Sequence, residues 1–144
     1  MTPYDPANVF AKILRGEIPC HKVHEDEATL AFMDVMPQAE GHTLVITKKP
    51  ARNLLDIASD DLCAVMRQVQ KTALAVKEAF GAGGVLIMQF NEAPAGQTVF
   101  HFHVHVIPRQ HEQPLMQHAR QMADPAELAE HAKRIRDVLV RQSY

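Results

Sequence analysis

Apolar residues return every three or four positions between about residues 60 and 80, which is the spacing of an amphipathic helix. Ser59 stands where an N-cap is expected, and Gly81 stands where a C-cap is expected. The pattern therefore predicts one long helix with a continuous apolar side. The residues of that side are Leu62, Val65, Met66, Val69, Ala73, Val76 and Phe80.

Shorter helical patterns lie near both ends of the chain. Asp5-Pro6 is typical of an N-cap followed by a first-turn proline, and Gly16 is typical of a helix stop. Asp124-Pro125-Ala126-Glu127 resembles a capping box that begins a last helix over about 125–141. We therefore expect a short amphipathic helix before the first strand and a longer helix at the C-terminal end.

The remaining apolar segments have the composition of β-strands bounded by turns. They span roughly 20–25, 28–33, 42–47, 85–90 and 98–107, and Pro108 is expected to end the last of them. The sum predicts an α+β domain, in which one antiparallel sheet carries the long helix packed across it and has helices at both ends. We expect a single domain over 1–144 with its core in 8–110.

Composition excludes several classes of partner. The formal net charge of −2 and the sequence pI near 6.5 argue against general affinity for duplex nucleic acid. No apolar run reaches the length of a membrane span, and the first residues lack the regions of a signal peptide. Cys20 and Cys63 are far apart, so neither a disulfide framework nor a cysteine-rich zinc site follows. We expect a cytoplasmic protein without nucleic-acid or membrane partners.

The last predicted strand carries histidine at every second position. Because alternate strand residues point to the same face, His101, His103 and His105 share one face, while Phe102 and Val104 point toward the core. Three interpretations are open at this point. The row is a solvated face rich in histidine, a metal site, or a site of nucleophilic catalysis.

Geometry distinguishes the metal site from nucleophilic catalysis. Strand rise places the outer two Cα atoms about 13 Å apart, whereas zinc needs its nitrogens within about 2.1 Å of one point. Two of the three histidines can share a zinc with help from elsewhere, but three in a row fit badly. An imidazole with a pKa near 6.5 keeps a neutral, nucleophilic nitrogen at pH 7. Asn91, Gln97 and Thr98 lie just before the strand and offer donors for a phosphoryl group.

Residues 96–109 resemble the signature of the histidine triad family, in which three histidines alternate with apolar residues. Their sequence is Gly96-Gln97-Thr98-Val99-Phe100-His101-Phe102-His103-Val104-His105-Val106-Ile107-Pro108-Arg109. The resemblance extends back through Asn91-Glu92 and Phe32-Met33-Asp34 to the helix around Phe10. It covers roughly 8–110. It implies a nucleotide-binding homodimer that cleaves a bond at the α-phosphate of a nucleoside phosphate.

The resemblance also implies roles for individual residues. His103 matches the residue that forms a covalent nucleotidyl intermediate, and His101 and His105 match the flanking members of the triad. His42 matches a fourth histidine near the phosphate, and Thr98 matches a hydroxyl close to the leaving group. The positions that match nucleotide contacts are Asn91 and Gln97 at the phosphate, Asp34 at the ribose hydroxyls, and Val9, Phe10, Ile13, Phe32 and Val35 around the base. From the residues alone, core packing stays open for Phe10, Ile13 and His42, and a turn role for Asp34.

Departures from the family pattern refine the expectation. Some bacterial relatives carry a structural zinc on a Cys-x-x-Cys pair, at the positions where this chain has Asn8 and Ala11. We therefore expect no structural zinc, and no cofactor. The third triad position is His105 rather than the glutamine of the transferase branch, which favours hydrolysis. The histidines without a matched role are expected at the surface: His21, His24, His111, His118 and His131.

Together these features favour a hydrolase of purine nucleoside phosphoramidates or related nucleotidyl substrates. One alternative is a dinucleoside polyphosphate hydrolase, as in the fragile histidine triad branch, which the stretches 96–99 and 108–109 also resemble. Asp34 fits the nucleotide-binding branch better. Another alternative is a nucleotide-binding protein with vestigial activity, although a pure binder has no need of a nucleophile.

Overall fold

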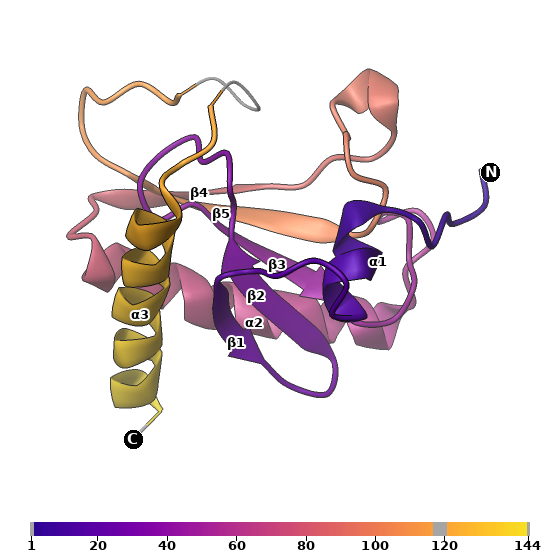
Figure 1. The fold of residues 1–144 in the computed structure, drawn as a ribbon, viewed down its shortest axis with the longest axis horizontal. Helices are drawn as coiled ribbons and strands as arrows, with labels where there is room; N and C mark the ends of the chain where they lie inside the picture. The colour runs from indigo at the N-terminus through magenta and orange to yellow at the C-terminus, as the bar shows by residue number, and fades with distance from the viewer. Residues whose placement is uncertain (1, 117–120, 144) are drawn as a thin grey trace.

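A five-stranded antiparallel sheet in the order β1-β2-β3-β5-β4 organises the computed structural model, which describes residues 2–116 and 121–143 (Figure 1). The strands are β1 (Lys22–Glu25), β2 (Thr29–Met33), β3 (Thr43–Thr47), β4 (Gly84–Met88) and β5 (His103–Arg109). The helices are α1 (Val9–Leu14), α2 (Ser59–Ala79), α3 (Pro125–Gln142) and the 3-10 turn η1 (Ala93–Ala95). The predicted α+β architecture is confirmed. Within the described ranges, no helix is both long and apolar enough to cross a bilayer.

The two faces of the sheet serve different purposes. Ala31 and Met33 of β2 point into the larger core cluster, where the sheet packs against α2 and α3. Leu30 and Phe32 of the same strand point the other way, toward α1. Figure 1 shows α2 running behind the sheet and α1 in front of it. The alternation of side chains along each strand thus separates a face for core packing from a face for the candidate site.

The last strand begins and ends later than predicted. β5 begins at His103, because its pairing with β3 covers only His103 to Val106, and the segment before it bends away from the sheet. The strand then continues through Pro108, which lies opposite Val85 of β4. Beyond Val106 the strand has a neighbour on one side only, so a residue without an N–H is tolerated there. The expected stop at Pro108 was therefore wrong.

Two of the three expected helix starts also differ. The N-cap of α1 is Asn8, whose side chain accepts from the Ala11 N–H, and not Asp5. Ser59 is the first residue of α2, and Ala58 occupies the cap position without a side-chain hydrogen bond. The start of α3 is confirmed, because the Asp124 carboxylate accepts from the Ala126 N–H. Several polar residues near each helix start can act as the N-cap, and the sequence pattern alone does not decide which one does.

Among the histidines expected at the surface, His131 is buried instead. Its ring meets the Phe80 ring edge-on at 5.1 Å between centroids, and the Arg134 guanidinium lies 4.4 Å from the centroid of the Phe80 ring. His21 and His24 are partly buried, whereas His118 lies outside the described residues. The histidine packs against an aromatic ring that the sequence did not place beside it.

The position of the Phe80 ring also requires a glycine at residue 41. Its backbone has φ +87°, and a Cβ there would lie 2.6 Å from Cε2 of Phe80. Because His131 and Arg134 hold the ring, Phe80 cannot move aside easily. Gly16 has a similar positive φ of +78°, but nothing lies within 4 Å of the position of its Cβ.

We predict that Gly41→Ala lowers the free energy of unfolding by about 2–4 kcal/mol, because it adds a steric overlap to the cost of a left-handed residue. Gly16→Ala is the matched control and should lose only about 1–2 kcal/mol, the backbone part. Urea denaturation of both variants measures the difference. Equal losses would show that the contact with Phe80 does not constrain this turn.

Candidate active site

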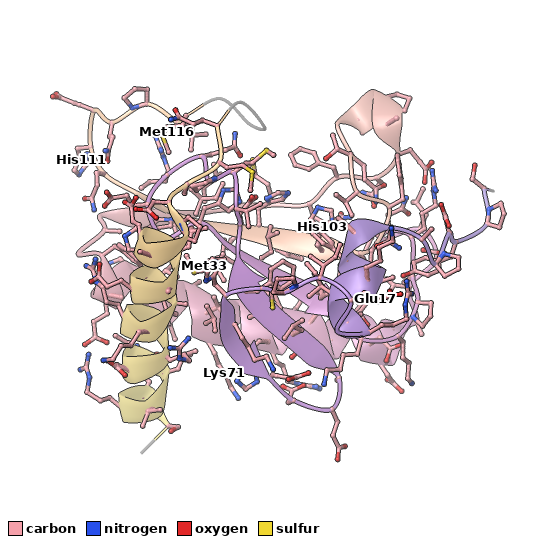
Figure 2. The ribbon with its side chains drawn as sticks, viewed as in Figure 1. Glu17, Met33, Lys71, His103, His111 and Met116 are labelled. Atoms are coloured by element: carbon pink, nitrogen blue, oxygen red, sulfur yellow. The ribbon has the colours of Figure 1, made fainter. Side chains whose placement is uncertain are left out.

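Aromatic rings from three parts of the chain form a continuous row on the α1 side of the sheet. The rings of His42 and His105 have centroids 5.1 Å apart, and those of His105 and His103 are also 5.1 Å apart. Phe10 of α1 continues the row, with its centroid 4.9 Å from that of His103. Figure 2 shows His103 at the α1 end of β5. The structure thus brings the fourth histidine, two triad members and one predicted base-wall residue together.

The proton position on His103 follows from its backbone partner. Its Nδ1 lies 2.6 Å from the carbonyl oxygen of His101, and a carbonyl oxygen can only accept. Nδ1 must therefore carry the proton and donate, which leaves the lone pair of the neutral ring on Nε2. His103 is 7% exposed as a residue, the most of the four histidines of the site. These features are those of an oriented imidazole nucleophile.

The proton positions on His42 and His105 also follow from their hydrogen-bond partners. The Gln38 N–H donates to Nδ1 of His42 at 3.0 Å, so the proton of neutral His42 lies on Nε2. Nε2 of His42 lies 2.9 Å from Nδ1 of His105 and donates to it. The proton of neutral His105 is then on its Nε2. This arrangement turns His105 into a hydrogen-bond donor on the side away from His42.

Asp34 lies beside this pair. One carboxylate oxygen accepts from the Met36 N–H at 2.8 Å, and the other lies 3.4 Å from Nε2 of His42. Asp34, His42 and His105 each offer one ligand atom, and these three atoms lie within 4.8 Å of one another. Such a set of nitrogen and oxygen donors suits a divalent ion. His105 is the one triad member in that set. The ribose role expected for Asp34 stays a prediction.

His101 faces a different environment. Its side chain is fully buried, Nε2 donates to the Thr47 carbonyl oxygen at 2.7 Å, and Nδ1 lies 2.6 Å from the hydroxyl of Tyr4. Burial lowers the pKa of His101, and the hydrogen bond to Thr47 offsets part of that shift. His101 is therefore a neutral member of the triad, with both ring nitrogens hydrogen-bonded within the protein. Tyr4 was missed, because a single tyrosine in a polar terminal segment gives no sequence signal.

The loop before the triad rests on a polar network. Gln97 is buried, and its amide donates to the carbonyl oxygens of Arg52 and Val99 while its oxygen accepts from the Glu92 N–H and from Asn53. Arg52 donates two hydrogen bonds to the Glu92 carboxylate, and these lower the pKa of Glu92. Both amide protons of Gln97 are thus used within the protein. The sequence did not reveal this network, because its members are about 40 positions apart.

The other expected polar residues lie along the same loop. The Asn91 side-chain oxygen accepts from the Leu54 N–H and from Gln89, and its amide donates to Gln89. The Thr98 side chain is exposed, and it makes no hydrogen bond to any residue the structure describes. Asn91 therefore shapes the loop, while the leaving-group role expected for Thr98 stays a prediction.

The predicted base wall is partly assembled. Phe10 and Phe32 are buried and meet edge-on at 5.4 Å, and Ile13 packs against the same cluster. Val9 and Val35 are 38% and 40% exposed. The first three residues share one apolar cluster beside His103, whereas the two valines present apolar surface to solvent.

Comparison with known proteins gives one family. A model of the HIT domain family matches residues 15–112. An uncharacterized HIT-like protein of Methanocaldococcus jannaschii is 44% identical over 101 residues, which cover 70% of this chain and 78% of that protein. Adenosine 5'-monophosphoramidase of Schizosaccharomyces pombe is 35% identical over 105 residues, 73% of this chain and 76% of that protein.

A solved structure gives the same result. The crystal structure of a HIT-like protein from Bartonella henselae matches with a TM-score of 0.89 and 51% identity, over 94% of this chain and 99% of that chain. The residues that match the family model include His42 and the three triad histidines, but not Tyr4 or Phe10.

Proposed function

The chain belongs to the HIT domain family, and from this premise we propose that it is a nucleotide hydrolase acting at the α-phosphate of purine nucleoside phosphoramidates or related nucleotidyl substrates. The observation that carries the proposal is the proton order of the site, in which His103 offers a lone pair and His105 a proton. The similarity to a phosphoramidase of fission yeast supports the substrate class.

The first step is an in-line attack of His103 Nε2 on the α-phosphorus. A phosphorus–nitrogen bond forms as the bond to the leaving group breaks, and the electron pair of that bond departs with the leaving group. A phosphoramidate protonated on nitrogen releases a neutral amine, and a phosphate leaves as its anion. The Nε2–H of His105 donates to a phosphoryl or leaving-group atom, where negative charge develops. Preorganised donors act more strongly where the surroundings are shielded from solvent, and His105 is only 5% exposed. The buried His42 holds His105 in the required orientation.

The second step is attack of water on the same phosphorus. A phosphorus–oxygen bond forms, and the bond to His103 breaks and returns its electron pair to Nε2. The surplus proton of the water passes to solvent, and a nucleoside monophosphate leaves. In this scheme Thr98 contacts the leaving group and Asp34 the ribose hydroxyls, and the base lies against Phe10, Phe32 and Ile13. Gln97 supports the loop rather than offering its side chain to the phosphate, since its amide protons are already donated.

We predict that the protein hydrolyses adenosine 5'-phosphoramidate with a kcat/KM about ten-fold or more above that for diadenosine triphosphate. His103→Ala should lower kcat by about 10³-fold or more, because it removes the nucleophile. His111→Ala, a change at an exposed histidine, is the matched control and should keep full activity. Nucleotide release measured by chromatography gives all of these rates. Retained turnover in His103→Ala would end this mechanism, and preference for the dinucleotide would assign the other substrate class.

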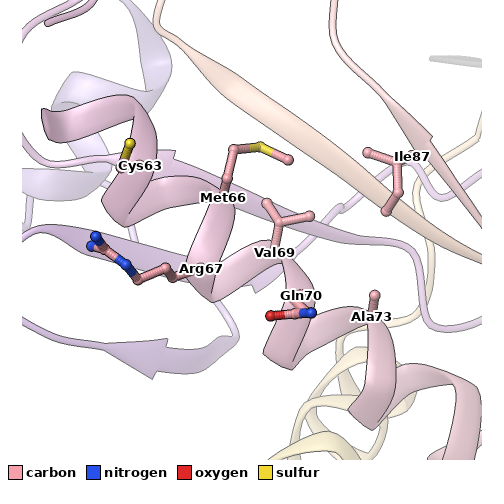
Figure 3. A pocket seen from close by; sticks show the side chains of 7 residues that line it. All are labelled: Cys63, Met66, Arg67, Val69, Gln70, Ala73 and Ile87. Carbon is pink, nitrogen blue, oxygen red and sulfur yellow. The ribbon is translucent and has the colours of Figure 1, made fainter. Parts of the chain in front are cut away.

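We propose further that two copies of the chain associate through α2 and β4. The strand β4 is an edge of the sheet, so its outer backbone groups lack a strand partner within the described chain. A shallow hollow lies between this strand and α2, and Figure 3 shows Met66, Val69 and Ala73 of α2 facing Ile87 of β4. Met66 and Ile87 are 43% and 41% exposed. The hollow is lined by Cys63, Met66, Arg67, Val69, Gln70, Ala73 and Ile87.

A second copy is the occupant that suits an apolar hollow beside an open strand edge. Two copies related by a two-fold axis can pair β4 with β4 antiparallel, which extends the sheet and covers both hollows at once. Such an interface is self-complementary, because the same residues are contributed from both sides.

We predict that Ile87→Glu converts the protein from a dimer to a monomer, because it places two charges at the centre of the interface. Val140→Glu, at an exposed valine of α3, is the control and should leave the dimer intact. Sedimentation velocity at micromolar concentration measures the mass of each variant. A monomeric wild-type protein, or a dimer that survives Ile87→Glu, would contradict this interface.

A further inference from the structure

Tyr4 reaches the triad from the N-terminal segment. Its hydroxyl lies 2.6 Å from Nδ1 of His101, and the two rings meet edge-on with centroids 5.7 Å apart. Asn8 donates from its side-chain amide to the Tyr4 hydroxyl at 3.0 Å. We propose that Tyr4 is a positioning residue, which holds the His101 ring and, through it, the carbonyl that orients His103. This role rests on the proposed function, because it acts on the nucleophile of that reaction.

The direction of the hydrogen bond follows from the other side of the ring. The Thr47 carbonyl oxygen accepts from Nε2 of His101, so the proton of the neutral ring lies on Nε2 and Nδ1 is an acceptor. The Tyr4 hydroxyl must then donate. Burial raises the pKa of Tyr4, which keeps its hydroxyl protonated at neutral pH, and the amide of Asn8 opposes part of that shift. The Tyr4 hydroxyl therefore carries the proton of this hydrogen bond, and Nδ1 of His101 acts as the hydrogen-bond acceptor.

His101 depends on this partner because its own ring has no exposed surface. The His101 side chain is fully buried, so an Nδ1 without Tyr4 would be a buried acceptor with no donor in place. A ring flip would satisfy Nδ1 only by breaking the hydrogen bond to Thr47. The ring is thus fixed from two sides, by Thr47 of β3 and by Tyr4.

The position of the His101 carbonyl is not fixed by the sheet. Pairing of β5 with β3 ends at His103, so His101 lies outside the regular ladder. The Phe102 N–H belongs to the same planar peptide group as the His101 carbonyl, and it donates to the Ala51 carbonyl oxygen. That hydrogen bond holds one end of the peptide group, and the His101 ring, held at both nitrogens, restrains the other end. The same His101 carbonyl accepts the hydrogen bond that His103 donates from Nδ1. A looser His101 would therefore loosen the bond that assigns the lone pair of His103 to Nε2.

Asn8 connects this contact to the first helix. Its side-chain oxygen caps α1 at the Ala11 N–H, while its amide donates to the Tyr4 hydroxyl and to the Asp5 carbonyl oxygen. The helix that carries Phe10 and the tyrosine that holds His101 are thus tied by one side chain. Tyr4 and Asn8 both precede residues 15–112, the part that matches the family model.

Tyr4→Phe tests the role, because it removes the hydroxyl and keeps the ring that packs against His101. We expect kcat for adenosine 5'-phosphoramidate to fall about ten-fold while KM changes less than about two-fold, as misorientation of a reacting group predicts. Pro3→Ala changes an exposed neighbour in the same segment and serves as the control, with both constants unchanged. An unchanged kcat in Tyr4→Phe would overturn the positioning role, even if the variant were less stable.

A second readout does not depend on turnover. In ¹⁵N-histidine spectra of the ligand-free protein at pH 7.5, His103 should be the Nδ1–H tautomer, and Tyr4→Phe should shift it toward a mixture of tautomers. His101 Nδ1 should also lose the signature of an accepted hydrogen bond. If His103 keeps a single tautomer in Tyr4→Phe, the proposal is wrong. A wild-type protein that turns over neither substrate would refute the proposed function, while these spectra would still decide the role of Tyr4.

Discussion

The hydrogen bond that His103 Nδ1 donates to the His101 carbonyl oxygen is the interaction on which the whole site depends. Histidine is nucleophilic only at the nitrogen without a proton, and a carbonyl partner decides which nitrogen that is. The same logic orders His42 through the Gln38 N–H and His105 through His42. Backbone groups cannot exchange donor and acceptor roles, so the His101 carbonyl and the Gln38 N–H fix the protons of His103 and His42, and His42 then fixes the proton of His105.

The sheet that carries this row of histidines has two different faces, one in the core and one at the site. Phe102, Val104 and Val106 anchor the strand in the core beneath α2, so the alternate histidines must face the other side. There Phe10 of α1 packs against His101 and His103, and Phe90 packs against His105. Burying the polar rings of His42, His101, His103 and His105 is unfavourable, but each of these rings is hydrogen-bonded within the protein.

Sequence patterns predicted what depends on spacing and left open what depends on distant partners. The period of α2, the cap at Asp124 and the alternation of His103 and His105 are local features, and the structure has them. Tyr4 beside His101 and Gln97 beside Arg52 are separated by 97 and 45 positions, so no local pattern could pair them. His131 was wrongly expected at the surface, because its burial depends on Phe80 from another helix.

The central claim is that His103 attacks through Nε2 and forms a covalent intermediate. The most direct measurement is mass-spectrometric mapping of the wild-type protein after a denaturing quench during turnover of adenosine 5'-phosphoramidate. The account predicts an adenylyl group on the peptide that contains His103, with fragmentation placing it on that residue and model phosphoramidates assigning it to Nε2. An adenylyl group on His101, His105 or Thr98, or steady turnover without any covalent adduct, would contradict it.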